Sequence, residues 1–281
     1  GITAQVAIGL ARASGCHLEL VGRTPVPAAY EDPATAAAAD RVALRRVLAQ
    51  AGGRSPAQIE LATSRILAER EIRSTLAELA GLAASVRYAA VDVQIPEAVT
   101  ALIEDVYQRH TRLDGIVHGA GVLADGLMAE KTLQDFARVW ATKVDGARAL
   151  ADAARADLGF LVLFGSVSGV FGNRGQADYA AANDALDTLA RTWSSAGGPP
   201  RAHRRVLAVD WGPWAAPGDS AGMVTGELAR EYARRGIELI QPEDGVASLL
   251  AELAHGADSH VVYLAGSAGT DPSAFGAGRD G

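Results

Sequence analysis

The chain has 281 residues and a formal net charge of −7, and 49% of its residues are hydrophobic while only 5% are aromatic. This length suffices for one α/β domain with a core of alanine, leucine and valine. The negative charge argues against a nucleic-acid partner, and the single cysteine, Cys16, excludes an internal disulfide framework and a cysteine metal site. No apolar run is long enough to span a membrane and no signal-peptide pattern is present, so we expect a soluble, cytoplasmic protein without a metal ion.

Six short apolar runs, separated by stretches with helical periodicity, predict a parallel sheet. They lie at residues 18–21, 86–91, 115–118, 160–164, 206–210 and 260–264. Several are apolar at consecutive positions, which is typical of strands buried on both faces. Strands that alternate with helices predict an α/β fold of the Rossmann type, a doubly wound parallel sheet with helices on both faces.

The first residues, 1–4, lead directly into a helical pattern. Ile2, Val6 and Leu10 share one side of this helix, which is expected to end near Gly15. No strand precedes the helix in this sequence. The first strand of the sheet is therefore expected to be missing, with the chain beginning inside a glycine-rich turn.

The connection from residue 24 to residue 80 is long and is interpreted as a helical insertion. One helix is predicted over 33–50. A second is predicted to begin at Ser55, where a proline follows and Gln58 stands three positions later, the pattern of a capping box. Gly81 is placed to end that helix.

These elements are expected to form a single domain over residues 1–266. The insertion returns directly to the next strand, so it is not expected to be a domain of its own. Residues 267–281, rich in glycine, serine and alanine, are interpreted as a flexible linker.

Two residues suggest proton-transfer chemistry. Ser166 follows the predicted strand 160–164, at the end where ligands bind in open α/β sheets. Tyr179 follows thirteen positions later and begins a helix. A tyrosine, with an unperturbed pKa of about 10, becomes a useful donor at neutral pH if a nearby ammonium stabilises its phenolate. Ser166 would hold a substrate carbonyl while negative charge builds on its oxygen.

The position of the lysine that would supply this ammonium group is similar to that in a known family. In most short-chain dehydrogenases a lysine follows the tyrosine by four positions, but here Asn183 stands there, and Lys143 on the preceding long helix is the substitute. This exchange, with the motifs at 164–169 and 175–183, resembles the ketoreductase domains of modular polyketide synthases. The resemblance extends to about Gly266 and implies four catalytic residues: Ser166, Tyr179, Lys143 and Asn183.

The resemblance also implies a nicotinamide cofactor. Residues 1–3 resemble the end of a phosphate-binding glycine turn at a helix N-terminus. Residues 118–121 resemble the turn beside the nicotinamide ribose, and 211–214 the loop that flanks the nicotinamide. Arg23 favours NADPH because it can pair with the 2′-phosphate, whereas NADH would prefer a carboxylate there. The implied cofactor residues are Gly1, Ile2, Arg23, Asp92, Val93, Ala120, Gly121, Lys143, Tyr179, Gly212, Pro213 and Trp214.

The stereochemistry of the product also follows from the resemblance. Leu123-Ala124-Asp125 is similar to the Leu-Asp-Asp loop of ketoreductases that give the D-3-hydroxyl. Ketoreductases that give the L-alcohol carry a tryptophan eight positions before the tyrosine, where this chain has Phe171. The D product is therefore favoured. Substrate and stereochemical control are assigned to Leu123, Asp125, Phe171 and Met223, the last in a lid segment at 222–224.

Within the family, the insertion and the stretch 121–126 are most similar to ketoreductases of iterative polyunsaturated fatty acid synthases, with heterocyst-glycolipid and enediyne synthases as alternatives. Gly165 stands where a serine often precedes the catalytic one, and this exchange is expected to have no effect. His118 is expected to be a satisfied core or turn histidine. The basic residues 201–205 are interpreted as a solvated edge, with docking of an acidic carrier as the alternative.

The implied reaction is NADPH-dependent reduction of a 3-oxoacyl thioester to a 3-hydroxyacyl thioester in polyketide or fatty-acid biosynthesis. The implied partners are an acyl carrier domain and neighbouring synthase domains. Two alternatives remain. A non-catalytic structural domain of a synthase predicts a broken set of catalytic residues, and a free-standing carbonyl reductase predicts a lysine in place of Asn183.

Overall fold

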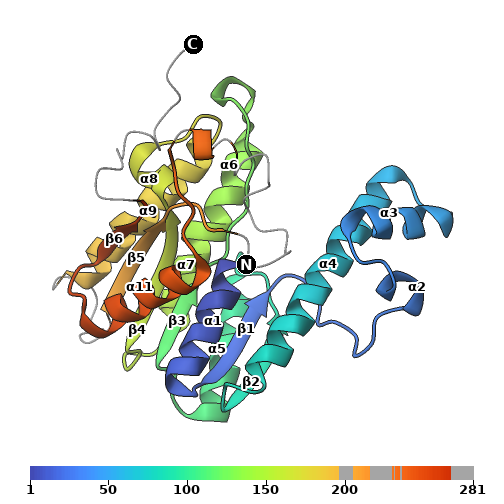
Figure 1. Ribbon diagram of the computed structural model, residues 1–281. Helices are drawn as coiled ribbons and strands as arrows, with labels where there is room; N and C mark the ends of the chain where they lie inside the picture. Colours follow the sequence, from blue (N-terminus) through green and yellow to red (C-terminus); the bar gives the residue numbers. More distant parts are fainter. Residues whose placement is uncertain (196–204, 216–229, 231, 235, 267–281) are drawn as a thin grey trace. The chain divides into compact units, whose positions relative to one another are not determined.

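The computed structural model describes residues 1–195, 205–215, 230, 232–234 and 236–266 (Figure 1). The chain forms two compact units: a larger unit of Gly1–Gly9 and Asp92–Gly281, and a smaller unit of Leu10–Val91. The first helix, α1 (Ile2–Ser14), begins in the larger unit and continues into the smaller one. It is followed by Gly15 with a φ of 60°, the left-handed conformation that favours glycine after a helix.

Four parallel strands form the sheet of the larger unit, in the order β3-β4-β5-β6 (Figure 1). They are β3 (Gly115–His118), β4 (Phe160–Ser166), β5 (Arg205–Trp211) and β6 (His260–Tyr263). Consecutive residues of β4 and β5 are buried. Because successive side chains of a strand point to opposite faces, both faces of these two strands are covered. The last four predicted strands are confirmed.

Helices pack around this sheet. They are α5 (Pro96–His110), α6 (Leu133–Trp140), α7 (Gly146–Ala153), α8 (Val167–Phe171), α9 (Ala177–Ser194) and α11 (Pro242–His255), with a short 3₁₀ turn at Met128–Glu130. A π-helical turn (Ala141–Asp145) joins α6 to α7. The long helix α9 packs against β4 and β5. No helix within the described ranges is both long and apolar enough to cross a membrane.

The smaller unit contains the other two predicted strands, β1 (His17–Gly22) and β2 (Ser85–Ala90). They pair in parallel, with His17 opposite Ser85 and Gly22 opposite Ala90. All six predicted strands are therefore confirmed. In the described part of the chain, hydrogen bonds join them as one pair and one group of four.

The insertion consists of α2 (Pro33–Ala36), α3 (Arg41–Gln50) and α4 (Pro56–Leu79). The predicted capping box at the start of α4 is confirmed. The N–H of Gln58 donates to Oγ of Ser55 at 3.3 Å, and Oε1 of Gln58 accepts from the N–H of Ser55 at 2.8 Å. Both bonds satisfy N–H groups at the start of the helix that have no partner within it.

The prediction of one helix over 33–50 is wrong. α2 ends at Ala36, and the chain is not helical again until α3 begins after Asp40, whose φ is −131° and ψ is 175°. The carboxylate of Asp40 accepts a hydrogen bond from the N–H of Ala43 at 2.7 Å and begins α3 as its N-cap. The stabilisation of this cap explains why two helices replace one.

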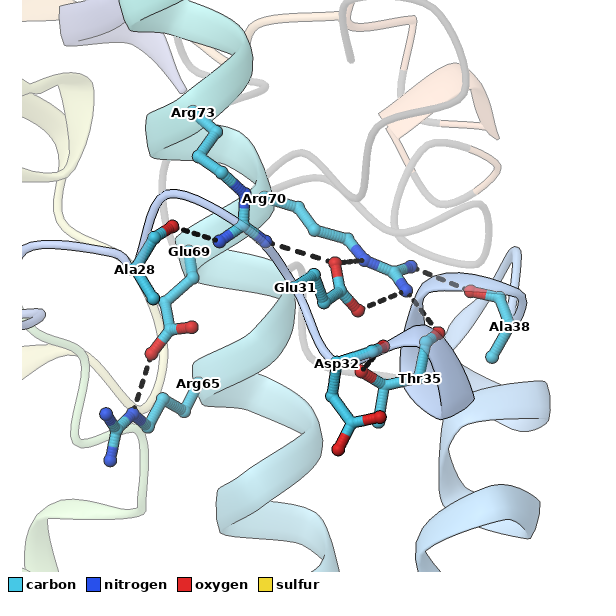
Figure 2. Close-up of polar contacts among 9 residues, drawn as sticks. All are labelled: Ala28, Glu31, Asp32, Thr35, Ala38, Arg65, Glu69, Arg70 and Arg73. Carbon is cyan, nitrogen blue, oxygen red and sulfur yellow. Dashed lines mark hydrogen bonds and ion pairs between the residues drawn. The ribbon is translucent and has the colours of Figure 1, made fainter.

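An ion network holds the loop before α2 against α4 (Figure 2). Arg70 donates to both carboxylate oxygens of Glu31, at 2.8 and 2.9 Å. It also donates to the backbone carbonyl oxygens of Thr35 and Ala38. Arg73 donates to Glu31 at 3.0 Å. The hydrogen bond from Arg70 is the main reason why the pKa of Glu31 lies below its ordinary value.

Candidate active site

Ser166 lies at the end of β4 and is the N-cap of α8. Its Oγ accepts hydrogen bonds from the N–H of Ser168 at 3.3 Å and from the hydroxyl of Ser168 at 2.9 Å. These bonds orient the Ser166 side chain at the carboxyl end of the sheet. Because Ser166 accepts both of them, its own O–H remains available as a donor.

Tyr179 lies in the first turn of α9 and is 9% exposed. Burial raises the pKa of its phenol, and hydrogen bonding to Asn183 and Ser166 opposes that shift. Asn183 follows one turn later and donates from Nδ2 to the backbone carbonyl oxygen of Tyr179 at 2.8 Å. Its Oδ1 is buried and has no hydrogen-bond partner among the described residues.

The π-helical turn carries Lys143, which is only 3% exposed. Its Nζ donates to the backbone carbonyl oxygen of Phe164 at 2.9 Å and lies 5.1 Å from the centre of the Tyr179 ring. Burial lowers the pKa of Lys143 to about 8, although the carboxylates of Asp210 and Asp187 act in the opposite direction. At neutral pH the lysine is therefore mostly charged and stands beside the phenol.

One cavity of about 490 Å³ brings most of the predicted residues together. Ser166, Tyr179 and Lys143 all line it. The other predicted residues that line it are Gly1, Ile2, Gly121, Leu123, Asp125, Gly212, Pro213 and Trp214. Every residue of this lining belongs to the larger unit.

Several predicted residues do not line this cavity. Those in the larger unit are Asn183, Ala120, Asp92, Val93 and Phe171. Asp92 holds a turn by accepting a hydrogen bond from the N–H of Gln94 at 3.0 Å. Arg23 follows β1 in the smaller unit, and Met223 lies outside the described residues, as does the whole predicted lid at 222–224. Their assigned roles stay predictions.

The cavity has an aromatic wall whose contacts the sequence did not predict. The ring of Trp211 stacks on Tyr263 with ring centres 5.1 Å apart and meets Trp214 edge-on at 5.0 Å. The indole N–H groups of Trp211 and Trp214 are buried without an acceptor among the described residues. Buried indole N–H groups usually find a partner, so both are candidate donors to a ligand.

A group of three ionisable side chains lies next to β4: Asp187 from α9, Asp210 from β5 and His260 from β6. Nε2 of His260 is 3.0 Å from Oδ2 of Asp210 and 3.6 Å from Oδ2 of Asp187. Burial raises the pKa of Asp187 to about 7, and the hydrogen bond to Asp210 raises the pKa of His260. Since two neighbouring buried carboxylates resist ionising together, this group retains a proton at neutral pH.

The glycine at position 165 has a structural role that was not expected. A Cβ at Gly165 would collide with Oδ1 of Asp210, which is completely buried. The exchange of serine for glycine therefore makes room for this carboxylate. The expectation that the exchange has no effect concerned catalysis, and it stays a prediction.

His118 and Arg205 make contacts within the fold. Nε2 of His118 lies 2.9 Å from the backbone oxygen of Lys143, and burial lowers the pKa of the imidazole to about 4. His118 is thus a satisfied, neutral core histidine, as predicted. Arg205 donates to the carboxylate of Glu252 at 2.7 Å. The remaining residues of the basic cluster, 201–204, lie outside the described residues.

The family model described as "KR domain" matches residues 1–216. This chain belongs to the KR domain family. The predicted resemblance to ketoreductase domains, a family of oxidoreductases that use a nicotinamide cofactor, is therefore confirmed.

Curated relatives of this KR domain are much longer proteins. It is 33% identical to a polyunsaturated fatty acid synthase protein of Thraustochytrium over 254 residues, which make up 86% of this chain and 9% of that protein. It is 38% identical to polyketide synthase GfsB of Streptomyces halstedii over 180 residues, 64% of this chain and 3% of that protein. The KR domain thus spans a small part of these relatives.

Solved structures confirm the Rossmann-type α/β fold. An N-terminal ketoreductase from the macrolactin assembly line has a TM-score of 0.67 and 26% identity, covering 92% of this chain and 41% of that one. A short-chain dehydrogenase from Streptomyces avermitilis has a TM-score of 0.60 at 18% identity, covering 93% of this chain and 83% of that one. The second likeness concerns the fold alone.

Proposed function

We propose that this KR domain uses NADPH to reduce the β-keto group of a 3-oxoacyl thioester to a 3-hydroxyl. The observation that carries the proposal is the meeting of Ser166, Tyr179 and Lys143 around one cavity. They come from β4, α9 and the π-helical turn, which only the fold brings together. A buried tyrosine beside a buried lysine with a lowered pKa is a typical proton-transfer site.

Tyr179 delivers the proton in this reaction. Its phenol gives a proton to the substrate carbonyl oxygen, which leaves a phenolate in a buried place. Burial disfavours that phenolate, and the adjacent Lys143 ammonium stabilises it. Ser166 donates its O–H to the same carbonyl oxygen while negative charge builds there. Asn183 holds the backbone carbonyl of Tyr179 and so orients the first turn of α9.

The lining of the cavity fits a nicotinamide dinucleotide, which supplies the hydride when it is bound. Gly1 and Ile2 line the cavity at the start of α1, where a helix N-terminus favours a phosphate. The indole N–H groups of Trp211 and Trp214 offer two donors that have no acceptor within the described residues. Arg23 is the residue proposed to bind the 2′-phosphate and so to select NADPH.

The D-3-hydroxyl is the proposed product. Leu123 and Asp125 line the same cavity as Tyr179, which supports a part for this loop in orienting the substrate. Phe171 occupies the position at which a tryptophan marks the ketoreductases that give the L-alcohol.

The proposed substrate is an acyl chain tethered to an acyl carrier domain, within an assembly that contains neighbouring synthase domains. This part of the proposal rests on the relatives, which are polyketide synthases and a polyunsaturated fatty acid synthase protein.

The test is NADPH consumption with a 3-oxoacyl N-acetylcysteamine thioester, using the protein in its full natural length. Tyr179→Phe removes only the phenolic O–H and is expected to lower kcat at least about 1000-fold while NADPH still binds. Tyr30→Phe is the matched control, because Tyr30 is 89% exposed, and it is expected to leave kcat unchanged.

Three other outcomes would contradict the proposal. No turnover by a folded protein that binds NADPH would favour a structural domain of a synthase. Turnover of small ketones but not of thioesters would favour a free-standing carbonyl reductase. Equal kcat/KM values for NADH and NADPH would remove the assigned role of Arg23.

A further inference from the structure

An ion pair lies in the interior directly before Tyr179. Nζ of Lys131 is 2.7 Å from Oδ1 of Asp178, and the two side chains are only 7% and 1% exposed. Taking two charges out of water is costly, so a buried ion pair is weak evidence for stability. A role in holding the other hydrogen-bond partners of Lys131 and Asp178 in place explains better why the chain keeps this buried pair.

Each member of the pair bonds to a different wall of the active-site cavity. Nζ of Lys131 donates to the backbone oxygen of Ala124 at 2.6 Å, in the loop 123–125 whose first and last residues line the cavity. Oδ1 of Asp178 accepts a hydrogen bond from the backbone N–H of Tyr179 at 2.9 Å. A continuous chain of contacts thus runs from the loop, through the ion pair, to the tyrosine.

Two other hydrogen bonds join the same segments. Nε2 of Gln176 donates to the carboxylate of Asp125 at 3.1 and 3.2 Å, and the N–H of Gly126 donates to the oxygen of Gly175 at 2.9 Å. The bond between Gln176 and Asp125 is exposed, so water competes with it. The ion pair is shielded from water, and its loss is expected to displace the loop most.

We propose that Lys131 and Asp178 are positioning residues that fix the loop 123–125 relative to Tyr179. With the carbonyl oxygen held at the phenol, the position of this loop decides which face of the carbonyl carbon receives the hydride, so the pair sets the stereochemical outcome as well as the rate. This inference rests on the proposed function, because it concerns the same reaction.

The experiment measures the ratio of D- to L-3-hydroxyacyl product, kcat, KM and the unfolding midpoint for Lys131→Met, Asp178→Asn and the double variant. Each single variant leaves one buried charge without its partner and is expected to lose thermal stability. Both are expected to lower kcat about 10- to 100-fold, with a smaller change in KM, and to lower the product ratio at least about fivefold. The matched control is Arg138→Met, which removes a nearby cation that is 52% exposed and pairs with Asp135 at 3.6 Å.

The double variant separates positioning from charge balance. Removing both charges leaves no unpaired ion, so its unfolding midpoint is expected to recover, while its product ratio stays as low as in the single variants. A double variant that regains the product ratio would overturn the inference, as would folded single variants with an unchanged ratio. If the unchanged protein reduces no thioester, the proposed function fails and this inference fails with it.

Discussion

Two charged side chains, Glu31 in the smaller unit and Lys143 in the larger unit, have surroundings that act on their charge in opposite ways. In the smaller unit, the carboxylate of Glu31 accepts hydrogen bonds from both Arg70 and Arg73 and its pKa is lowered (Figure 2). In the larger unit, Lys143 donates to one backbone carbonyl and forms no ion pair within the described residues. The insertion thus stabilises the ionised form of Glu31, whereas the active site destabilises the charged form of Lys143. A buried charge that its surroundings compensate only in part is retained where the reaction creates an opposite charge.

The strongest test of this comparison is Lys143→Met, which we expect to abolish activity and to stabilise the unliganded protein. Turnover should fall at least about 1000-fold, because no cation remains beside the phenolate. A lysine whose pKa falls from 10.5 to about 8 on folding costs roughly 3 kcal/mol at neutral pH. After subtraction of about 1 kcal/mol for the lost hydrogen bond to Phe164, the net gain is about 2 kcal/mol.

The sign of this effect can be checked with pH. Because folding lowers the pKa of Lys143, its unfavourable contribution is complete below pH 8 and disappears as the pH rises from about 8 to 10.5. Urea unfolding at pH 7 and at pH 10.5 should therefore show a gain for Lys143→Met only at pH 7. Arg148→Met, at a half-exposed position in the next helix, is the matched control. A variant less stable than the unchanged protein at pH 7 would contradict the comparison.

Glu31→Gln should show the reverse behaviour, with a loss of stability and little loss of activity. The substitution leaves Arg70 and Arg73 without their carboxylate, and in this partly buried network it is expected to cost about 1–2 kcal/mol. Hydrogen exchange should become faster over residues 28–38, while kcat at saturating NADPH stays within about twofold. Glu69→Gln breaks the more exposed pair with Arg65 in the same helix and should cost less than about 0.5 kcal/mol. Equal effects of the two substitutions would argue against the network in Figure 2.

A small change in stability is expected from the group of Asp187, Asp210 and His260. Because the three side chains share a proton, this group is neither fully paired like Glu31 nor, like Lys143, without an ion pair in the described part of the chain. Folding raises the pKa of Asp187 from 3.8 to about 7, so its contribution to stability is complete below pH 3.8 and is lost as the pH rises through 7. Asp187→Asn cannot ionise, so it should gain stability over the unchanged protein as the pH rises from 4 to 8. Because Asp187 shares its proton with Asp210 and His260, the gain is expected to be about 1–2 kcal/mol, below the roughly 4 kcal/mol of an independent carboxyl. The measurement is the difference in urea midpoint between the two proteins across this range. A constant difference would show that Asp187 ionises normally.

Local patterns in the sequence were sufficient for much of the fold and of the site. The strands are short apolar runs, and the capping box at Ser55 needs only four residues. Ser166 and Tyr179 were predicted from one motif and its spacing. The break at Asp40 was missed because an alanine-rich stretch has high helix propensity throughout, and one aspartate cap outweighed it.

Contacts between distant segments could not be predicted in this way. Lys131 and Asp178 are separated by 47 positions; Asp178 lies in the motif 175–183, but Lys131 belongs to none of the motifs that carry the resemblance. The aromatic wall around Trp211 requires the register of β5 against β6, which places Trp211 opposite Tyr263. The collision at Gly165 likewise depends on the side chain that β5 places opposite β4. Each of these needs the coordinates of two elements that are remote in the chain.

The contact between Gly165 and Asp210 has a consequence for how this chain can change. Serine at position 165 would require Asp210 to turn away, which would break its hydrogen bond to His260. We therefore expect the two positions to be epistatic: a substitution at 165 should cost less stability once the carboxylate at 210 has been replaced by a smaller side chain. The easier mutational route is expected to begin on β5 and to end next to Ser166.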